Sequence, residues 1–201
     1  INAIIGMDEM ILRESKEPAI EGYAADLRGS ALHLLGLVND ILDFSKIEAG
    51  KMELVPVEYG LGSLLNDLVN MTEIRARNKN LAFILKADPK LPTVLHGDEV
   101  RVKQVAMNIL TNAVKYTRQG SVTLAVTYRK LSDQKVVLRF SVKDTGIGIK
   151  PEDLPKLGQA FQRIEEARNA TIEGTGLGMN ITQRLLSMMH SRLEVESVYG
   201  E

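Results

Sequence analysis

Residues 144–149 constrain the fold most strongly, because this Asp-Thr-Gly-Ile-Gly-Ile run directly follows the alternating apolar segment 136–142. Strict alternation of apolar and polar residues predicts a strand. The strand therefore delivers one carboxylate, Asp144, to its end, where Gly146 and Gly148 turn the backbone. We expect a buried acid that binds a ligand, with the backbone close enough to touch it. The alternative, which this motif taken alone favours, is that Asp144 simply caps a turn.

A second glycine cluster lies downstream and opens an apolar helical run. It comprises Gly174, Thr175, Gly176, Leu177 and Gly178. Glycines allow backbone N–H groups to point at phosphate, and the start of the following helix adds positive potential. The polar residues 163–173 before the cluster lack a clear period and are interpreted as a lid over the site. An ordinary glycine turn before a helix is the alternative interpretation.

A predicted helix upstream carries Asn108, Asn112 and Lys115 on one face, because these residues are four and three positions apart. Asparagine is a poor residue for the middle of a helix, so two on one face need a reason. An amide oxygen is a suitable ligand for Mg²⁺, which keeps several waters and phosphate oxygens. Lys115 would meet the charge of the phosphates. A solvated polar face explains this helix alone equally well.

The first 50 residues predict two helices, at residues 1–15 and 19–49, joined by a short turn around Pro18. In the second helix, apolar residues recur every seven positions over three to four heptads. They include Leu27, Leu34 and Ile41 on one row and Ala31 and Val38 on the other. A helical hairpin cannot bury such a seam alone, so we expect a homodimer through residues 1–50 that completes a four-helix bundle. The alternative is that the seam packs on the rest of the chain. Gly50 is expected to end the second helix at the C′ position, and residues 46–51 resemble a hinge.

From residue 51 the periodicity changes to a mixture of strands and helices. Strands are predicted at residues 52–57, 81–86, 121–128, 135–143 and 193–198, and helices at 64–75, 100–115 and 176–189. Ser63 and Asp98 are the expected N-caps of the first two of these helices, and Ser132 and Asp133 the hairpin connection. The fold class is therefore α+β, with a helical hairpin at 1–50 and a two-layer α/β sandwich at 51–201.

Composition excludes several classes of protein. The net charge is −1, with 25 Lys and Arg against 26 Asp and Glu, so it gives no case for nucleic acid or an anionic membrane. The chain has no cysteine and three scattered histidines, which argues against disulfides, thiolate sites and a His-rich metal site. No apolar run approaches the roughly 20 residues that span a bilayer. We expect a cytoplasmic segment, in a parent protein that could itself be membrane-anchored.

Taken together, the three motifs in this order resemble the core of a sensor histidine kinase, in particular the hybrid or response-regulator-coupled kind. Residues 108–117 are similar to the family's N box, and residues 144–149 and 174–179 to its two glycine boxes. Residues 159–163 resemble the F box, and residues 39–50 the end of the dimerisation hairpin. Gly97 and Asp98, with Arg101 and Gln104, are a further match. The resemblance covers essentially the whole chain.

The resemblance implies an ATP-binding domain of the Bergerat type, as in gyrase and MutL. Asn108 would coordinate Mg²⁺, Asn112 and Lys115 would lie near the phosphates, and Tyr116 would line the nucleotide site. Asp144 would accept from the adenine amine, Gly146 and Gly148 would shape its pocket, and Arg163 would reach phosphate. The remaining residues of the implied site form the phosphate loop: Gly174, Thr175, Gly176, Leu177 and Gly178. The implied reaction transfers the γ-phosphoryl of ATP to a histidine and then to the receiver domain of a response regulator.

Some features depart from the family pattern. The acceptor histidine is expected upstream of Ile1, and none of His33, His96 and His190 replaces it. His190 stands where the family usually has glycine, and a further strand is expected beyond residue 200. Three other functions stay open. A gyrase-like ATPase would need a glutamate one turn before Asn108, where the chain has Gln104; a dimerisation scaffold would not respond to nucleotide; and a serine kinase of the mitochondrial type should lack the 41–50 pattern.

Overall fold

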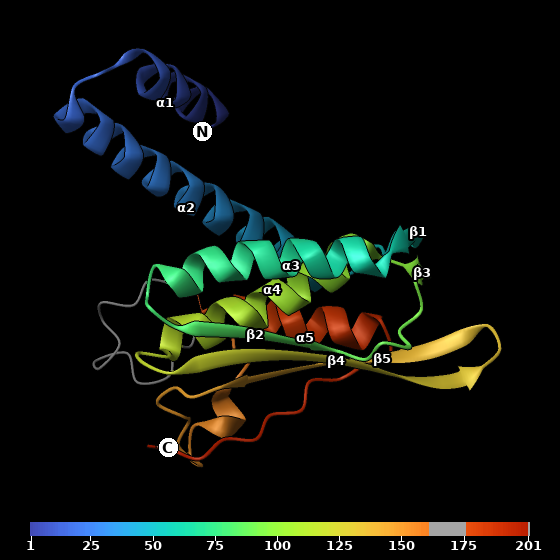
Figure 1. Cartoon of the computed structure of the whole chain (residues 1–201). Helices are drawn as coiled ribbons and strands as arrows, with labels where there is room; N and C mark the ends of the chain where they lie inside the picture. Colours follow the sequence, from blue (N-terminus) through green and yellow to red (C-terminus); the bar gives the residue numbers. More distant parts are fainter. Residues whose placement is uncertain (161–175, 201) are drawn as a thin grey trace. The chain divides into compact units, whose positions relative to one another are not determined.

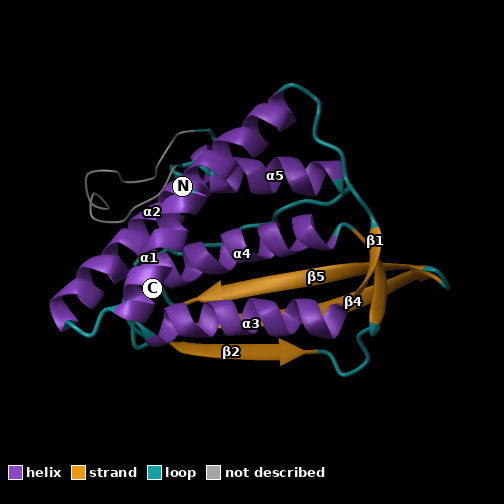
Figure 2. Cartoon of the chain, turned by 90° about the horizontal axis from the view of Figure 1, so that it is seen from above, coloured by secondary structure: helices purple, strands orange, loops and turns teal. Residues whose placement is uncertain are grey.

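The computed structural model describes residues 1–160 and 176–200 of the 201-residue chain. The chain divides into two compact units, Ile1–Met52 and Glu53–Glu201. The first is helical, and the second combines helices with two small sheets (Figures 1 and 2). The fold class predicted from the sequence, a helical hairpin followed by an α/β sandwich, is confirmed by this order of elements.

The first unit is a hairpin of α1 (Asn2–Glu14) and α2 (Pro18–Glu48), with Pro18 in the first turn of α2 as expected. Gly50 adopts φ +64°, and the Lys51 N–H donates to Lys46 O at 2.9 Å, so the predicted glycine at C′ is present. The seam is largely open within this chain. Leu27, Leu34 and Ile41 are 45%, 47% and 50% exposed. The hairpin therefore leaves apolar surface that a second molecule could cover.

The second unit contains β1 (Val57–Gly60), α3 (Leu61–Arg77), β2 (Ala82–Ala87), β3 (Val94–Gly97) and α4 (Glu99–Tyr116). They are followed by β4 (Ser121–Ser132), β5 (Lys135–Asp144), the short 3-10 helix η1 (Leu154–Lys156) and α5 (Gly178–Met188). β1 and β3 form an antiparallel pair. The larger sheet has the order β2-β4-β5, in which β2 runs parallel and β5 antiparallel to β4.

The core lies between this sheet and the helices α3, α4 and α5, which cover one of its faces (Figure 1). Alternate residues of β4, Val122, Leu124 and Val126, are fully buried, as the two-residue period requires. They pack against one side of α4 and the inner side of α3. Fully buried leucines from these helices include Leu61, Leu64, Leu68 and Leu110.

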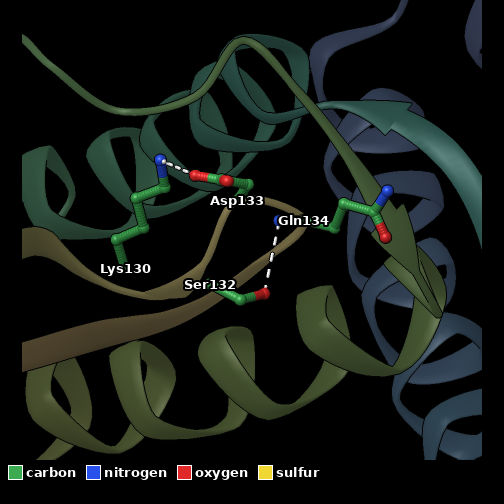
Figure 3. A network of polar contacts seen from close by, with 4 residues as sticks. All are labelled: Lys130, Ser132, Asp133 and Gln134. Atoms are coloured by element: carbon green, nitrogen blue, oxygen red, sulfur yellow. Dashed lines mark hydrogen bonds and ion pairs between the residues drawn. The ribbon is translucent and has the colours of Figure 1, made fainter.

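The β4–β5 hairpin extends beyond the helices and ends in a tight connection (Figures 1 and 3). Lys130 Nζ lies 2.7 Å from Asp133 Oδ1, and the Gln134 N–H donates to Ser132 Oγ at 3.3 Å (Figure 3). The register shifts between Lys130 and Ser132, where the strand has a bulge. Ser132 thus belongs to β4, and the turn lies at 133–134 rather than at 132–133 as predicted.

Several predicted boundaries were wrong. Residues 52–56 form no strand, because the Val55 N–H donates to Asp98 Oδ2 and Pro56 has no N–H to donate. Helix α3 begins at Leu61, so Ser63 is not its N-cap. The short strand β3 was missed, because four residues give too little periodicity.

Residues 193–198 also differ from the prediction, since no strand is assigned there. The reason lies in their hydrogen bonds. Ser197 Oγ accepts from the Ile149 N–H at 2.8 Å, and the Gly200 N–H donates to Ile147 O at 3.0 Å. This segment therefore binds the loop after β5 instead of pairing as a strand with the sheet.

Candidate functional site

Helix α4 is the frame of the site. Asp98 is its N-cap, as predicted, and accepts the Arg101 N–H on Oδ1 at 3.0 Å. One side of the helix is buried in the core through Val105, Ala106, Leu110, Ala113 and Val114. Asn108, Asn112 and Lys115 are half-buried on the remaining surface. Because the core side is fixed by packing, the three polar residues have a defined position on the unit.

Asn108 connects α4 to the start of α5. Its Nδ2 donates to Gly178 O and to Thr182 Oγ1, each at 3.3 Å. A Cβ placed on Gly178 would lie 3.7 Å from Asn108 Cγ. The second glycine cluster is thus held against the middle of α4. Thr182, which is fully buried, was missed from the sequence; its position four residues after Gly178 puts it on the same face of α5.

The first glycine cluster is held against the C-terminal end of α4. The Ile147 N–H donates to Tyr116 O at 3.4 Å. A Cβ on Gly146 would lie 2.8 Å from Tyr116 O and 3.2 Å from Thr117 Oγ1, so no larger residue fits without a shift. Thr117 is itself fully buried, and its hydroxyl donates to Ala113 O at 2.7 Å. The end of α4 thus requires glycine at position 146, and contact of this backbone with a ligand stays a prediction.

Asp144 does not have the burial that the sequence predicted. It is exposed at the end of β5, and its Oδ1 accepts the Gly146 N–H at 2.9 Å. The expectation of a buried acid was therefore wrong, and the capping interaction of the alternative reading is present. β5 is an edge strand of the described sheet, so its last residue has a neighbouring strand on one side only.

Gly148 has a separate structural reason for being glycine. Its φ is +67°, and a Cβ there would lie 2.0 Å from Val198 O. The C-terminal segment therefore passes directly over Gly148, and the hydrogen bonds of Ser197 and Gly200 keep it there. The loop after β5 is fixed on one side by α4 and on another by this segment.

Lys115 and Tyr116 lie at the C-terminal end of α4, close to the first glycine cluster. Lys115 Nζ stands 5.1 Å from the centre of the Tyr116 ring, within the range of a cation–π contact. A further lysine, Lys79, donates from Nζ to the carbonyls of Val114 and Lys115 at 3.0 and 2.8 Å. This cation stabilises the helix end, where free carbonyls concentrate negative potential. Lys79 was not predicted, because it lies in a turn far away in sequence.

The second glycine cluster is described only from Gly176 onward. Gly176 has φ +72°, Leu177 is fully buried, and Gly178 is the first residue of α5. Arg163, Gly174, Thr175 and the lid predicted at 163–173 lie outside the described residues. The described part brings two separate glycine motifs onto one helix, at Asn108 and at Tyr116, about 12 Å apart along the helix axis.

Two further observations concern the described residues. Within residues 1–160 and 176–200, no three or more His, Cys, Asp or Glu side chains gather in a way that could hold a metal ion. In the same part of the chain, no helix combines the length and apolarity needed to cross a bilayer.

Comparison with known proteins identifies the family. Residues 97–201, more than half of the chain, match the family described as "Histidine kinase-, DNA gyrase B-, and HSP90-like ATPase". Across its whole length the chain is 41% identical to the "Non-motile and phage-resistance protein" of Caulobacter vibrioides and 35% identical to the "Sensor histidine kinase GacS" of Pseudomonas protegens. It spans only 24% and 22% of those two proteins.

Solved structures give the same result. Full-length ShkA, crystallised in complex with AMPPNP, aligns with 94% of this chain and with 38% of its own length, with a TM-score of 0.71 and 32% identity. The histidine kinase AdeS of Acinetobacter baumannii aligns with 99% of this chain and 89% of its own, with a TM-score of 0.64 and 17% identity, which supports the fold alone. The predicted resemblance to sensor histidine kinases is thus confirmed, and the chain belongs to the histidine kinase-, DNA gyrase B- and HSP90-like ATPase family.

Proposed function

We propose that this chain is the nucleotide-binding core of a sensor histidine kinase. It binds Mg-ATP, and the parent protein transfers the γ-phosphoryl group to a histidine and then to an aspartate of a response regulator. The observation that carries the proposal is that both glycine clusters are fixed to one helix, at Asn108 and at Tyr116. An elongated ligand can then contact one cluster with its base and the other with its phosphates.

The adenine end of the site is assigned to Asp144, Gly146, Gly148 and Tyr116. Oδ1 of Asp144 is held by the Gly146 N–H at 2.9 Å, so the carboxylate has a fixed direction although it is exposed. Its second oxygen is proposed to accept a hydrogen bond from the exocyclic amine of adenine. Gly146 and Gly148 shape the loop beside this carboxylate, because the end of α4 and the C-terminal segment pack closely on them. A bound nucleotide would itself bury the carboxylate.

The phosphate end is assigned to Asn108 and Asn112, with Gly176, Leu177 and Gly178 at the start of α5. The first N–H groups of a helix lack partners within the helix. Lys115 lies beside Tyr116 at the other end of α4, and its long side chain is proposed to reach the phosphates on the family resemblance. Arg163, Gly174 and Thr175 are proposed for the same end on the family resemblance. Phosphoryl transfer depends mainly on positioning and on stabilising charge, which are the tasks of these groups.

Asn108 is proposed as the protein ligand of Mg²⁺. Its Nδ2 is used by Gly178 and Thr182, which turns Oδ1 to the opposite side of the amide. The donor set of the described residues holds no cluster of carboxylates or histidines, so most ligands of the ion would be phosphate oxygens and water, as Mg²⁺ prefers. The bound ion would neutralise phosphate charge.

The partners follow from the hairpin and the family. The open seam of α2 is proposed to form a homodimer through residues 1–50, because Leu27, Leu34 and Ile41 stay about half exposed. A response-regulator receiver domain is proposed as the acceptor of the phosphoryl group. The acceptor histidine of the kinase is expected upstream of Ile1.

Nucleotide binding tests the site directly. Asp144→Asn should weaken Mg-ATP binding about 10- to 100-fold, the equivalent of one charged hydrogen bond of about 1.5–3 kcal/mol. The double variant with Asn108→Ala should bind no nucleotide measurable by calorimetry. Asp133→Asn is a matched control, since Asp133 is an exposed carboxylate beside the other end of β5. Undiminished binding by the double variant would refute the site.

A gyrase-like ATPase is the second candidate. It needs a carboxylate near Asn108 to activate water, and position 104 has Gln104 instead, whose Oε1 accepts from Arg101 Nη1 at 2.7 Å. Steady release of phosphate by the purified chain with Mg-ATP would favour that candidate. A dimeric chain that binds no nucleotide would favour a scaffold.

A further inference from the structure

Asp98 makes two hydrogen bonds that join distant parts of the second unit. It is 8% exposed, so its carboxylate is largely removed from water. Oδ1 accepts the Arg101 N–H at 3.0 Å, which caps α4, and Oδ2 accepts the Val55 N–H at 2.8 Å. Val55 lies 43 residues earlier in the chain. One side chain thus fastens the start of α4 to the segment by which the chain enters this unit.

The entering segment is held at a second point by a strand pair. β1 follows Val55 and Pro56 and pairs antiparallel with β3, so that Val57 is opposite Gly97 and Tyr59 opposite Leu95. β3 ends at Gly97, immediately before Asp98. The ladder and the carboxylate therefore act on the same place, the N-terminus of α4. Any displacement of residues 53–56 is passed to that helix end rather than absorbed by a free loop.

Helix α4 carries the displacement to the proposed phosphate end of the site. Asn108 lies ten residues after Asp98, about 15 Å along the helix, and is bonded there to Gly178 of α5. A helix of 18 residues packed on one side moves as a body. Glu53 and Leu54 precede Val55 and directly follow the hairpin unit, which ends at Met52. The chain therefore has a continuous covalent and hydrogen-bonded route from the hairpin to Asn108.

We propose that Asp98 is a positioning residue for phosphoryl transfer: through its bond to the Val55 N–H it couples the segment from the hairpin to helix α4. The inference depends on the proposed kinase function, and Asp98 itself contacts no reacting atom. If Asp98 were only a helix cap, a substitution that keeps the cap but loses the hydrogen bond to Val55 would leave the rate of phosphoryl transfer unchanged. If Asp98 couples the two parts, that substitution would slow transfer while nucleotide binding stays intact.

Two variants separate the cap from the coupling. Asn is as good an N-cap as Asp, so Asp98→Asn keeps an oxygen for the Arg101 N–H. The amide has only one oxygen, and its NH₂ group cannot accept from the Val55 N–H. Val55→Pro removes the same bond from the other side, because proline has no N–H, and leaves Asp98 unchanged. Asp88→Asn is the matched control, since Asp88 accepts the Lys90 N–H at 2.8 Å in an exposed turn.

The test uses the full-length kinase that contains this chain, with radiolabelled ATP. We expect both variants to bind Mg-ATP within about twofold of wild type and to transfer phosphate to the histidine at least tenfold more slowly at saturating ATP. Asp88→Asn should match wild type in both. Wild-type transfer rates in both variants would overturn the inference. A loss of Mg-ATP affinity in parallel with the loss of transfer would also overturn it, because that result indicates a merely structural role for Asp98. Wild-type protein that binds no ATP would overturn the proposed function as well.

Discussion

Replacing Gly148 by alanine should disrupt the loop after β5. The residue has φ +67°, a conformation that costs an L-residue about 1–2 kcal/mol. The new Cβ would also lie 2.0 Å from Val198 O, a backbone atom that cannot rotate away. Relief requires the C-terminal segment to leave, with loss of the Ile149–Ser197 and Gly200–Ile147 hydrogen bonds. At about 0.5–1.5 kcal/mol for each bond, the total loss of stability is about 2–5 kcal/mol.

Urea unfolding measures this loss, and calorimetry measures nucleotide binding of the same variant. We expect the midpoint to fall and affinity for Mg-ATP to fall with it, because the loop that holds Asp144 is no longer fixed. Gly62→Ala is the control: Gly62 lies within α3, nothing is within 4 Å of its added Cβ, and the variant should be more stable by about 1 kcal/mol. If Gly148→Ala unfolds within 0.5 kcal/mol of wild type, or if Gly62→Ala loses as much, the reasoning from these contacts is wrong.

Three smaller predictions concern single residues. His190 closes α5 with φ +53°, so His190→Gly should raise the free energy of unfolding by about 0.5–1 kcal/mol, while His190→Ala should gain nothing, as thermal unfolding would show. Burial, and then the charge of Glu99, raises the pKa of Tyr59. The folded state therefore keeps the phenolic proton to a higher pH than the unfolded state does, and stability should fall as the pH rises above about 10. Urea midpoints between pH 8 and 11 should fall less steeply for Tyr59→Phe. The side chain of Asp8 is fully buried in the hairpin with no hydrogen-bond partner among the described residues. Asp8→Ala should therefore stabilise the hairpin by about 1–3 kcal/mol, as measured by thermal unfolding, whereas Asp26→Ala, at an exposed position, should not.

Local signals in the sequence predicted the parts of the fold that local physics determines. Asp98 was recognised as an N-cap and Gly50 as a C′ residue, because each depends on bonds within one helix end. The strands β4 and β5 follow from alternation alone. The two helices of the first unit follow from the heptad pattern and from Pro18 at the start of α2.

Non-local contacts account for the errors. β3 has four residues, and its partner β1 lies more than 30 residues earlier, so neither period nor proximity marks it. Alternation also does not tell how far other elements cover the end of a strand: Asp144 is exposed, although its partner in β4, Val122, is fully buried. Ser197 binds the loop after β5 through its hydroxyl and Gly200 through its backbone N–H, and neither group stands out in the sequence as a sign of that contact. The roles of Thr182 and Lys79 were likewise not predictable, because each touches α4 from a distant segment.

The two glycine clusters are held on α4 in different ways, which bears on how the proposed nucleotide would be bound. At Gly146 the side chain is excluded by Tyr116 O at 2.8 Å, so the loop position depends on the end of α4. At Gly178 an added Cβ would make an ordinary 3.7 Å contact with Asn108 Cγ, so there the hydrogen bonds of Asn108, and not the lack of a side chain, fix the distance. The proposed adenine end is therefore fixed by steric fit, and the proposed phosphate end by the side-chain hydrogen bonds of Asn108. The hydrogen bonds of Asn108 can break and re-form with small movements of α5, whereas the packing at Gly146 leaves no room for such movement. If α4 moves as a body, the loop at Gly146 moves with its end, and we expect adjustment during a phosphoryl-transfer cycle to be concentrated where Asn108 meets α5.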